Sequence, residues 1–189
     1  MRVVLAVSGA SGAALSLAAA RHLRGLGARI ELVVSAAAER TLAAECGAEA
    51  LAQLEALCDR RHDARDVGAE IASGSAHVDA MLVAPCSMRS LAAIALGLDD
   101  NLLTRAASVQ LKERRPLVLI AREAPYTLAH LRNMTAVTEM GGVVMPPVPA
   151  FYLRPETTGD IVAQIAARAV DLMRLGAPVA RAWTGEDPA

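Results

Sequence analysis

A basic and acidic cluster surrounds a short apolar segment within residues 111–125 (LKERRPLVLIAREAP). Lys112 precedes this segment, and Arg122 and Glu123 follow it. A buried strand of an α/β fold ends where ligands bind, and an Arg–Glu pair buried there is costly unless it binds something. These three side chains therefore predict a site for an anion beside a carboxylate that handles protons.

A turn of small residues follows the first apolar run of the chain, at 8–12 (SGASG). A tight glycine turn between a strand and a helix presents backbone N–H groups and the positive end of the helix dipole to an anion. Ser11 can cap the helix or reach the ligand. The spacing does not match GxGxxG, which disfavours a dinucleotide and favours a mononucleotide. A strand-to-helix turn without any ligand is the alternative.

Serines stand at the ends of two further predicted strands. Ser35 ends one of them, and Ser87 and Ser90 follow another in PCSMRS (85–90), where they can offer hydroxyls and N–H groups to an anion or a ring edge. Ser35 could instead only cap the helix that follows it. Cys86 is interpreted as inert packing and not as a nucleophile, because no His or Asn is placed to activate it.

Three more polar side chains are candidates whose positions decide less. Glu45 lies on a predicted helix, where a Glu is usually a solvated surface residue. Arg168 and Tyr152 would add a cation and a phenol, and a phosphate gains roughly 1.5–3 kcal/mol per charge-assisted hydrogen bond. A surface position for Arg168 and simple packing for Tyr152 are the alternatives. The four histidines match no metal-ligand spacing, so no metal site is predicted.

The elements that must position these residues follow from apolar runs and turn residues. We predict strands at 3–7, 30–34, 80–84, 117–120 and 143–145. We predict helices at 12–26, 36–46, 49–57 and 126–140, helical segments after residue 87 up to about residue 114, and a final helix from Thr157 or Thr158 to 175. Residues 59–72 are polar and could hold a short strand. Apolar strands that alternate with helices indicate an α/β fold, a Rossmann-like (flavodoxin-like) three-layer sandwich with a parallel sheet.

Length and composition suit one domain, residues 1–175, followed by a C-terminal tail at 176–189. Apolar residues make up 54% of the 189 residues but aromatic residues only 2%, so the core must consist of Ala, Leu and Val. This apolar fraction favours an oligomer, and an Ala-rich monomer is the alternative. Trp183, the single tryptophan, lies in the tail and is interpreted as a subunit contact.

Charge and cysteine content exclude several classes of partner. The formal net charge of −1 predicts no nucleic-acid binding. Three cysteines without paired spacing, and no signal peptide, favour a reducing cytoplasm. No segment reaches the roughly 20 apolar residues that span a bilayer.

The chain resembles the UbiX-type flavin prenyltransferases, formerly described as aromatic-acid or 3-polyprenyl-4-hydroxybenzoate decarboxylases. The likeness runs from Val3 to about Leu175, and residues 100–125 are its most specific part. It rests on the following motifs: SGASGA (8–13), the strand end at Ser35, SGS (73–75), PCSMRSLAAIALG (85–97), DNLLTRAASVQLKERRPLVLIAREAP (100–125), HLRNM (130–134) and the FY of PAFYLRP (149–155).

The resemblance implies a metal-independent transferase that joins the dimethylallyl group of dimethylallyl monophosphate to N5 and C6 of reduced FMN. The product, prenylated FMN, would pass to a UbiD-type decarboxylase. The resemblance also implies a homo-oligomer, a dodecamer, with sites shared between subunits. FMN would be held by Gly9, Ala10, Ser11, Ser35, Ser87, Met88, Arg89, Ser90 and Arg122. The prenyl phosphate would be bound by Lys112, Arg122, Glu123, Tyr152 and Arg168, and the catalytic residues would be Ser11, Glu45, Lys112 and Glu123.

Some positions depart from the family pattern. Arg132 stands where Glu is common, Ala150 replaces the usual Gly before the FY pair, and an aromatic residue before SGS is missing. These departures bear on the prenyl donor, and a monophosphate or a pyrophosphate donor stays open. Two rival functions are an FMN-dependent cysteine decarboxylase, whose His and PxMNxxMW-like segment are not seen here, and a non-catalytic FMN-binding subunit.

Overall fold

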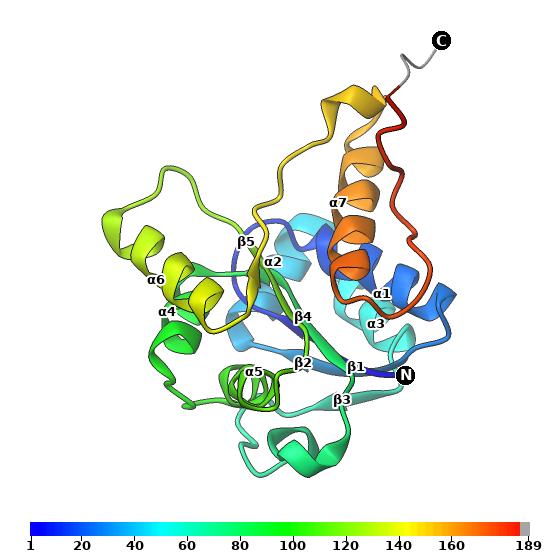
Figure 1. Cartoon of the computed structure of the whole chain (residues 1–189). Helices are drawn as coiled ribbons and strands as arrows, with labels where there is room; N and C mark the ends of the chain where they lie inside the picture. The colour runs from blue at the N-terminus through cyan, green and yellow to red at the C-terminus, as the bar shows by residue number, and fades with distance from the viewer. Residues whose placement is uncertain (186–189) are drawn as a thin grey trace.

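The computed structural model describes residues 1–185 as a parallel sheet between two helical layers (Figure 1). In chain order the elements are β1 (Arg2–Val7), α1 (Ala14–Gly25), β2 (Arg29–Val34), α2 (Ala36–Cys46), α3 (Ala50–Ala56), β3 (Arg60–His62), η1 (Glu70–Ala72), η2 (Gly74–Ala76), β4 (Ala80–Cys86), α4 (Met88–Leu96), α5 (Leu102–Lys112), β5 (Leu117–Ala121), α6 (Leu128–Glu139), β6 (Val143–Val144), η3 (Phe151–Leu153) and α7 (Thr158–Leu172).

The strand order is β3-β2-β1-β4-β5-β6, and every neighbouring pair is parallel. The chain builds outward from β1 to β3 and then crosses to the other side of β1 for β4 to β6. The order therefore reverses between β1 and β4, and ligands of such sheets bind beside the carboxyl ends at that reversal. The predicted α/β fold class is confirmed.

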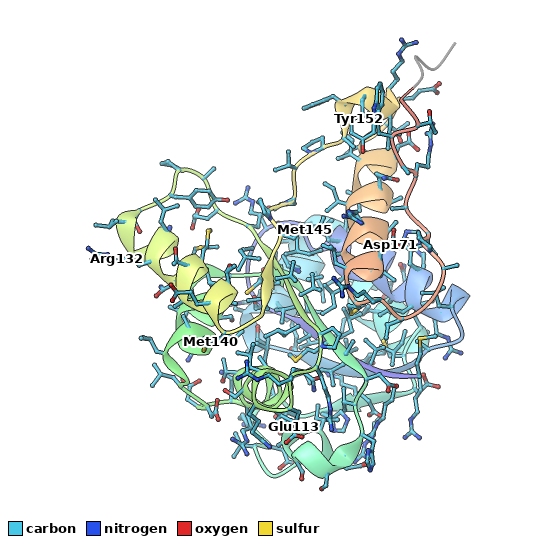
Figure 2. The ribbon with its side chains drawn as sticks, in the orientation of Figure 1. Glu113, Arg132, Met140, Met145, Tyr152 and Asp171 are labelled. Carbon is cyan, nitrogen blue, oxygen red and sulfur yellow. The ribbon has the colours of Figure 1, made fainter. Side chains whose placement is uncertain are left out.

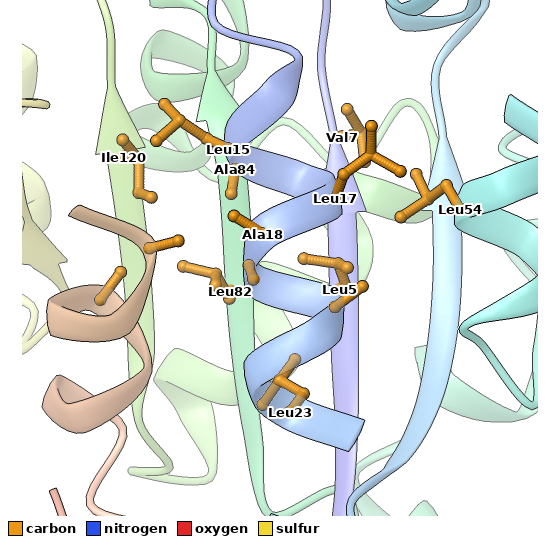
Figure 3. Close-up of a cluster of buried hydrophobic side chains, with 14 of the residues drawn as sticks. Leu5, Val7, Leu15, Leu17, Ala18, Leu23, Leu54, Leu82, Ala84 and Ile120 are labelled. Carbon is orange, nitrogen blue, oxygen red and sulfur yellow. The ribbon is translucent and has the colours of Figure 1, made fainter. Parts of the chain in front are cut away.

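Two apolar cores lie on opposite faces of the sheet. Leu5 and Leu82 of the strands pack with Leu23 of α1 and Leu54 of α3 in one core (Figure 3), which α7 also covers. Residues of α4, α5 and α6, among them Leu91, pack on the other face. The alternation of strand side chains between faces explains why these strands are apolar at every position, as the sequence indicated.

The predicted elements differ from the observed ones mainly at their ends. β4 continues past Ala84 to Cys86, with a register shift after Val83, because Pro85 has no N–H to continue the ladder. The open question in 59–72 is settled by β3, which pairs with β2. α6 begins after Thr127, whose hydroxyl accepts a hydrogen bond from His130 N.

One charged side chain is fully buried at the amino end of the sheet. The carboxylate of Glu31 accepts a hydrogen bond from Arg2 Nε (2.8 Å) and lies 2.7 Å from His62 Nε2. Burial alone would raise the pKa of Glu31, but its hydrogen bonds with His62 and Arg2 outweigh burial and hold the pKa below its usual value. The ionised carboxylate therefore links β1, β2 and β3 at that end.

Candidate functional site

Ser8 joins the two strands at which the sheet order reverses. Its Oγ donates to the carbonyl of Pro85 (3.0 Å) and accepts from the N–H of Ser87 (2.7 Å). Ser8 is buried, so these bonds satisfy its hydroxyl away from water. The turns after β1 and β4 are thereby held side by side, and they form the floor of the crevice in which this fold binds ligands.

The turn after β1 already holds an anion of its own chain. Glu45 Oε2 accepts hydrogen bonds from Gly12 N and Ala13 N, each at 2.8 Å. These are N–H groups that precede α1, which the sequence offered to an external anion. Glu45 thus occupies that anion site and neutralises the positive end of the helix.

The same carboxylate brings together three of the predicted residues. Burial would raise the pKa of Glu45, but the hydroxyl of Ser11, the N–H groups of Ala13 and Gly12 and the charge of Arg122 outweigh it and lower the pKa. Glu45 is consequently ionised at neutral pH. Ser11, Glu45 and Arg122 come from the β1 turn, the end of α2 and the end of β5, and they meet beside the reversal point.

Arg122 and Glu123 follow β5 as predicted, and both are at least partly open to solvent in the single chain. Arg122 is exposed and Glu123 is half-buried. The N–H of Arg122 donates to the carbonyl of Cys86 (3.1 Å), which aligns the ends of β4 and β5. Glu123 Oε1 accepts a bond from Ala124 N (3.0 Å). Neither side chain therefore bears a full desolvation cost in the single chain.

Two further helices begin at this edge of the sheet. Ser35 Oγ accepts from Ala38 N (3.2 Å) and caps α2, while Ser87 Oγ accepts from Ser90 N (3.3 Å) and caps α4. Both serines thus cap the helices that follow them, and their predicted ligand role stays a prediction. No acidic residue stands in the first turn of α4, whereas Glu45 serves α1. Among these helix ends, α4 keeps a positive end for an anion.

A close approach of α2 requires glycine at the start of the β1 turn. A methyl group at Gly9 would overlap the Cβ of Ala37. Arg89, in contrast, turns away to form an ion pair with Asp100 in the α4–α5 connection. Met88 is partly buried against the core on its side of the sheet. The predicted flavin-contacting role of Met88 and Arg89 thus has no support in their present contacts.

A cavity of about 580 Å³ lies between α7, the η3 loop and the tail. Tyr152, Arg168 and Trp183 line it, and the rings of Tyr152 and Trp183 meet edge to face with centroids 5.5 Å apart. An aromatic pair next to a guanidinium suits a ligand with an apolar part and an anionic part. The tail is thus part of a cavity wall in its own chain.

Hydrogen bonds fasten the tail along α7. The carboxylate of Asp171 accepts from Val179 N (2.7 Å) and Ala180 N (3.1 Å). The amide of Gln164 both donates to Arg181 O (2.8 Å) and accepts from Arg181 N (3.1 Å). Residues 186–189, the end of the predicted tail, lie outside the described residues. Trp183 is exposed, so the predicted subunit contact is compatible with its position and stays a prediction.

Lys112 lies at the opposite end of the sheet from this cavity and from the turns that follow β1 and β4. It ends α5, and β5 then runs for five residues, about 16 Å, before Arg122 is reached. Glu113, the next residue, sits far from Tyr152 in Figure 2. The Ser73-Gly74-Ser75 loop lies beside Lys112 and not beside the turns that follow β1 and β4. One chain therefore does not bring Lys112 to the other predicted phosphate ligands.

Burial removes Cys86 from consideration as a nucleophile. Its side chain is fully buried, and burial raises the pKa of the thiol to about 12. Within residues 1–185 no cluster of three His, Cys, Asp or Glu could hold a metal ion. No helix of this part of the chain has the length and apolar character needed to cross a membrane.

Comparison with known proteins gives a consistent family. The Flavoprotein family model matches residues 1–170. The flavin prenyltransferase UbiX of Neisseria meningitidis serogroup B is 52% identical over 97% of both chains, and that of Thauera aromatica is 46% identical over 99% of this chain and 96% of its own. The chain belongs to the UbiX flavin prenyltransferase family. The resemblance stated from the sequence motifs is confirmed.

Solved structures of UbiX proteins share the fold over almost their whole length. AnUbiX (PadA1), in complex with FMN and dimethylallyl pyrophosphate, is 43% identical with a TM-score of 0.93 and covers 98% of both chains. A dodecameric FMN-dependent UbiX-like decarboxylase from Escherichia coli O157:H7 is 43% identical with a TM-score of 0.92, over 98% of this chain and 100% of its own. The cysteine decarboxylase TvaF, at 20% identity and a TM-score of 0.64, shares the fold alone.

Sequence analysis missed two features of this UbiX-family site. The contact of Trp183 with Tyr152 was missed, and the only signal was that a single Trp stood in a polar tail. The second is that Lys112 is the only lysine of the chain, although Lys and Arg together number 19. A lone ammonium among guanidinium groups marks a position where a compact charge is needed.

Proposed function

We propose that this chain is a flavin prenyltransferase that joins the dimethylallyl group of dimethylallyl monophosphate to N5 and C6 of reduced FMN. The observation that carries the proposal is 52% identity to a flavin prenyltransferase over 97% of the chain. Prenylated FMN is the product and passes to a UbiD-type decarboxylase. Both substrates are small and anionic, which suits a site with several arginines and a lysine.

Reduced FMN binds in the crevice between the turns after β1 and β4. Gly9, Ala10 and Ser11 contact the ring, and its phosphate lies at the α4 end formed by Ser87, Met88, Arg89 and Ser90, near Ser35 and Arg122. The free positive end of α4 supports this placement, because Glu45 already occupies the end of α1. Binding of the phosphate requires Arg89 to leave Asp100 or to act only through its charge.

Ser11 and Glu45 handle the protons of the flavin near N5. The Ser11 hydroxyl donates to the Glu45 carboxylate. The lowered pKa keeps this carboxylate unprotonated, as a base must be, and also makes it a weak base. The backbone bonds of Gly12 and Ala13 hold that carboxylate in one orientation. The pair therefore acts as a fixed base beside the ring, and no other ionisable group in that turn competes for the role.

The prenyl donor binds next to the flavin, with its phosphate held by Arg122, Tyr152, Arg168 and Lys112, and with Glu123 in position to protonate it. Breaking the C1–O bond leaves the electron pair on phosphate and positive charge on the allyl carbons. Cations on the leaving anion favour that step, and the rings of Tyr152 and Trp183 help to exclude water from the allyl group.

The distance between Lys112 and the other phosphate ligands supports an active site shared between copies of the chain. We therefore propose a homo-oligomer, a dodecamer like the Escherichia coli UbiX-like relative. Lys112 of one copy then faces the Arg122 end of another. Such assemblies are symmetric, so every copy both donates and receives a lysine.

Residues 1–175 act as one FMN-binding domain followed by the tail at 176–189, of which residues 178 and 180–183 line the donor cavity. The single sheet and its two cores over β1 to α7 support one domain. A cytoplasmic location is supported by the three cysteines, which are all free.

Anaerobic incubation with reduced FMN and dimethylallyl monophosphate, followed by mass spectrometry of the flavin, tests the function. We expect the flavin mass to rise by one dimethylallyl unit. A parallel incubation with dimethylallyl pyrophosphate decides between the two donors. An unmodified flavin with both donors would refute the proposal and favour a flavin-binding subunit, provided that bound FMN is detected.

A further inference from the structure

Three arginines hold alternate carbonyl groups of the loop that carries Ser73-Gly74-Ser75. Arg105 Nε donates to Ala72 O (3.2 Å), Arg115 Nη2 to Gly74 O (2.7 Å) and Arg2 Nη1 to Ala76 O (3.0 Å). The arginines come from α5, from the segment before β5 and from β1. Because they are far apart in sequence, the loop is fixed from three directions at once.

This arrangement decides what the loop presents to its surroundings. The carbonyl oxygens of residues 72, 74 and 76 are directed inward to the guanidinium groups. The side chains of Ser73 and Ser75 are exposed, and their hydroxyls lie 2.8 Å apart. The outer face therefore carries hydroxyl donors, while the negative ends of three peptide dipoles are turned away from it.

Lys112 belongs to the same surface. A methyl group built on Gly74 would lie 2.6 Å from Lys112 Nζ, so the loop and the ammonium are in direct contact. Lys112 pairs with Glu113 on this surface. The Lys112–Glu113 pair therefore packs directly against Gly74, and a bond that fixes Gly74 also limits where the ammonium can lie.

Arg115 differs from the other two arginines in how its charge is neutralised. Arg2 pairs closely with Glu31 and Glu70, and Arg105 pairs with Asp99 at 2.9 Å. The ion pair that the structure shows for Arg115 is looser, at 3.9 Å from Glu113. Within the described residues its buried Nη1 has no hydrogen-bond partner, as is also true of Arg2 Nη2, so the looser ion pair is what sets Arg115 apart.

We propose that Arg115 is a positioning residue for the phosphate group of the prenyl donor. It acts through the Gly74 carbonyl: it holds the serine loop and Lys112 in the geometry that receives the phosphate, and it places a weakly neutralised positive charge behind them. This inference rests on the proposed function. The residue itself does not touch the substrate, since its guanidinium lies on the inner side of the loop.

Steady-state kinetics of Arg115→Met and Arg115→Lys with both substrates test the role. Methionine removes the bond to Gly74 and the charge, so KM for dimethylallyl monophosphate rises about tenfold while KM for reduced FMN stays within about twofold. Lysine can still donate to the carbonyl and restores most of the donor KM. Arg65→Met is the matched control, because Arg65 is an exposed arginine paired only with neighbouring Asp63.

An unchanged donor KM in Arg115→Met, or an equal loss toward both substrates without rescue by lysine, would overturn the proposal. If Arg115→Met does not fold, Arg115→Gln replaces it, because its amide can still reach the Gly74 carbonyl without the charge. We then expect a partial rise in the donor KM. A wild-type value in this uncharged variant would exclude the electrostatic part.

A second measurement separates this inference from the proposed function. Reductive ¹³C-methylation labels only Lys112 and the N-terminus, because the chain has one lysine. We expect the Lys112 NMR signal to shift on addition of dimethylallyl monophosphate, and a higher concentration to be needed in Arg115→Met. If the wild-type protein binds the donor by this signal but does not prenylate FMN, the proposed function fails alone. If both proteins titrate identically, the positioning role fails.

Discussion

At the scale of single residues, Glu45 binds the N–H groups of the turn that follows β1. The small-residue turn looks like a binding site for an external anion, but the chain supplies the anion itself from the end of α2. A carboxylate held by two N–H groups and a hydroxyl stays ionised. The turn is consequently pre-ordered before any ligand arrives, and the ligand meets a base and not an empty helix end.

Replacement of Glu45 by Ala should lower the free energy of unfolding by about 1 kcal/mol or less at pH 7, because an exposed helix-capping group is lost. The pKa of Glu45 is lowered from 4.5 in the folded state, so its contribution is present above that pH and disappears as the pH falls through the lowered value. Urea unfolding of both proteins at several pH values measures the difference.

Glu139→Ala, which removes an exposed carboxylate at the end of α6, is the control for this experiment. Its unfolding free energy should match that of the wild type at each pH. A Glu45→Ala protein as stable as wild type at pH 7 would show that the α1 cap is not significant in solution.

At the scale of elements, local chemistry was enough to predict most of the fold. Strands β1, β2, β4 and β5 are mostly apolar runs, whereas β3 (RRH) is not. The caps at Ser35, Ser87 and Thr157 occur where a polar residue precedes each helix. These signals are contained within a few neighbouring residues. The end of β4 was less predictable, because Pro85 is accommodated by a register shift that only its partner strand reveals.

The site was less predictable from sequence than the strands and helices. The contact of Glu45 with Gly12 joins residues 33 positions apart, and it depends on how α2 lies beside α1. Lys112 and Arg122 are close in sequence, yet β5 runs between them, so they lie at opposite ends of that strand. Family resemblance named these residues as candidates, and their roles stay predictions. Spacing alone could not say which of them meet within one chain.

The tail is the element whose attachment can be followed directly. Asp171→Ala removes the acceptor for Val179 N and Ala180 N and should release Trp183 from Tyr152. Because Trp183 is the only tryptophan, intrinsic fluorescence reports on the tail alone. We expect lower fluorescence anisotropy and a higher KM for the prenyl donor in this variant.

Asp66→Ala is the matched control, because the Asp66 carboxylate bonds only to Gly68 N within its own loop. Its anisotropy should equal that of the wild type. Unchanged anisotropy in Asp171→Ala would mean that contacts other than the Asp171 bonds hold the tail in place.

At the scale of the whole molecule, the sheet separates the two groups of phosphate ligands. Lys112→Ala and Glu123→Gln should each abolish prenylation when expressed alone. Co-expressed, they should recover roughly a quarter of the wild-type sites, because a site built from Lys112 of one chain and Glu123 of another is intact when each comes from the unmutated copy. Activity per bound FMN, measured by mass spectrometry, quantifies the recovery.

The pair Arg122→Ala and Glu123→Gln provides the control for complementation. Both residues follow β5 in the same chain, so no mixed assembly contains an intact pair and no recovery is expected. Absence of recovery with Lys112→Ala would mean that Lys112 acts within its own chain.

Lys112 lies at the amino end of β5, away from the turns where the flavin is proposed to bind, and this position bears on activity at low protein concentration. With a site shared between copies as proposed, a lone protomer lacks the ammonium of its neighbour, so we expect turnover per molecule to fall on dilution below the concentration at which the copies separate. A cell could then hold the flavin already bound in scattered protomers, with chemistry beginning only once enough of them have gathered.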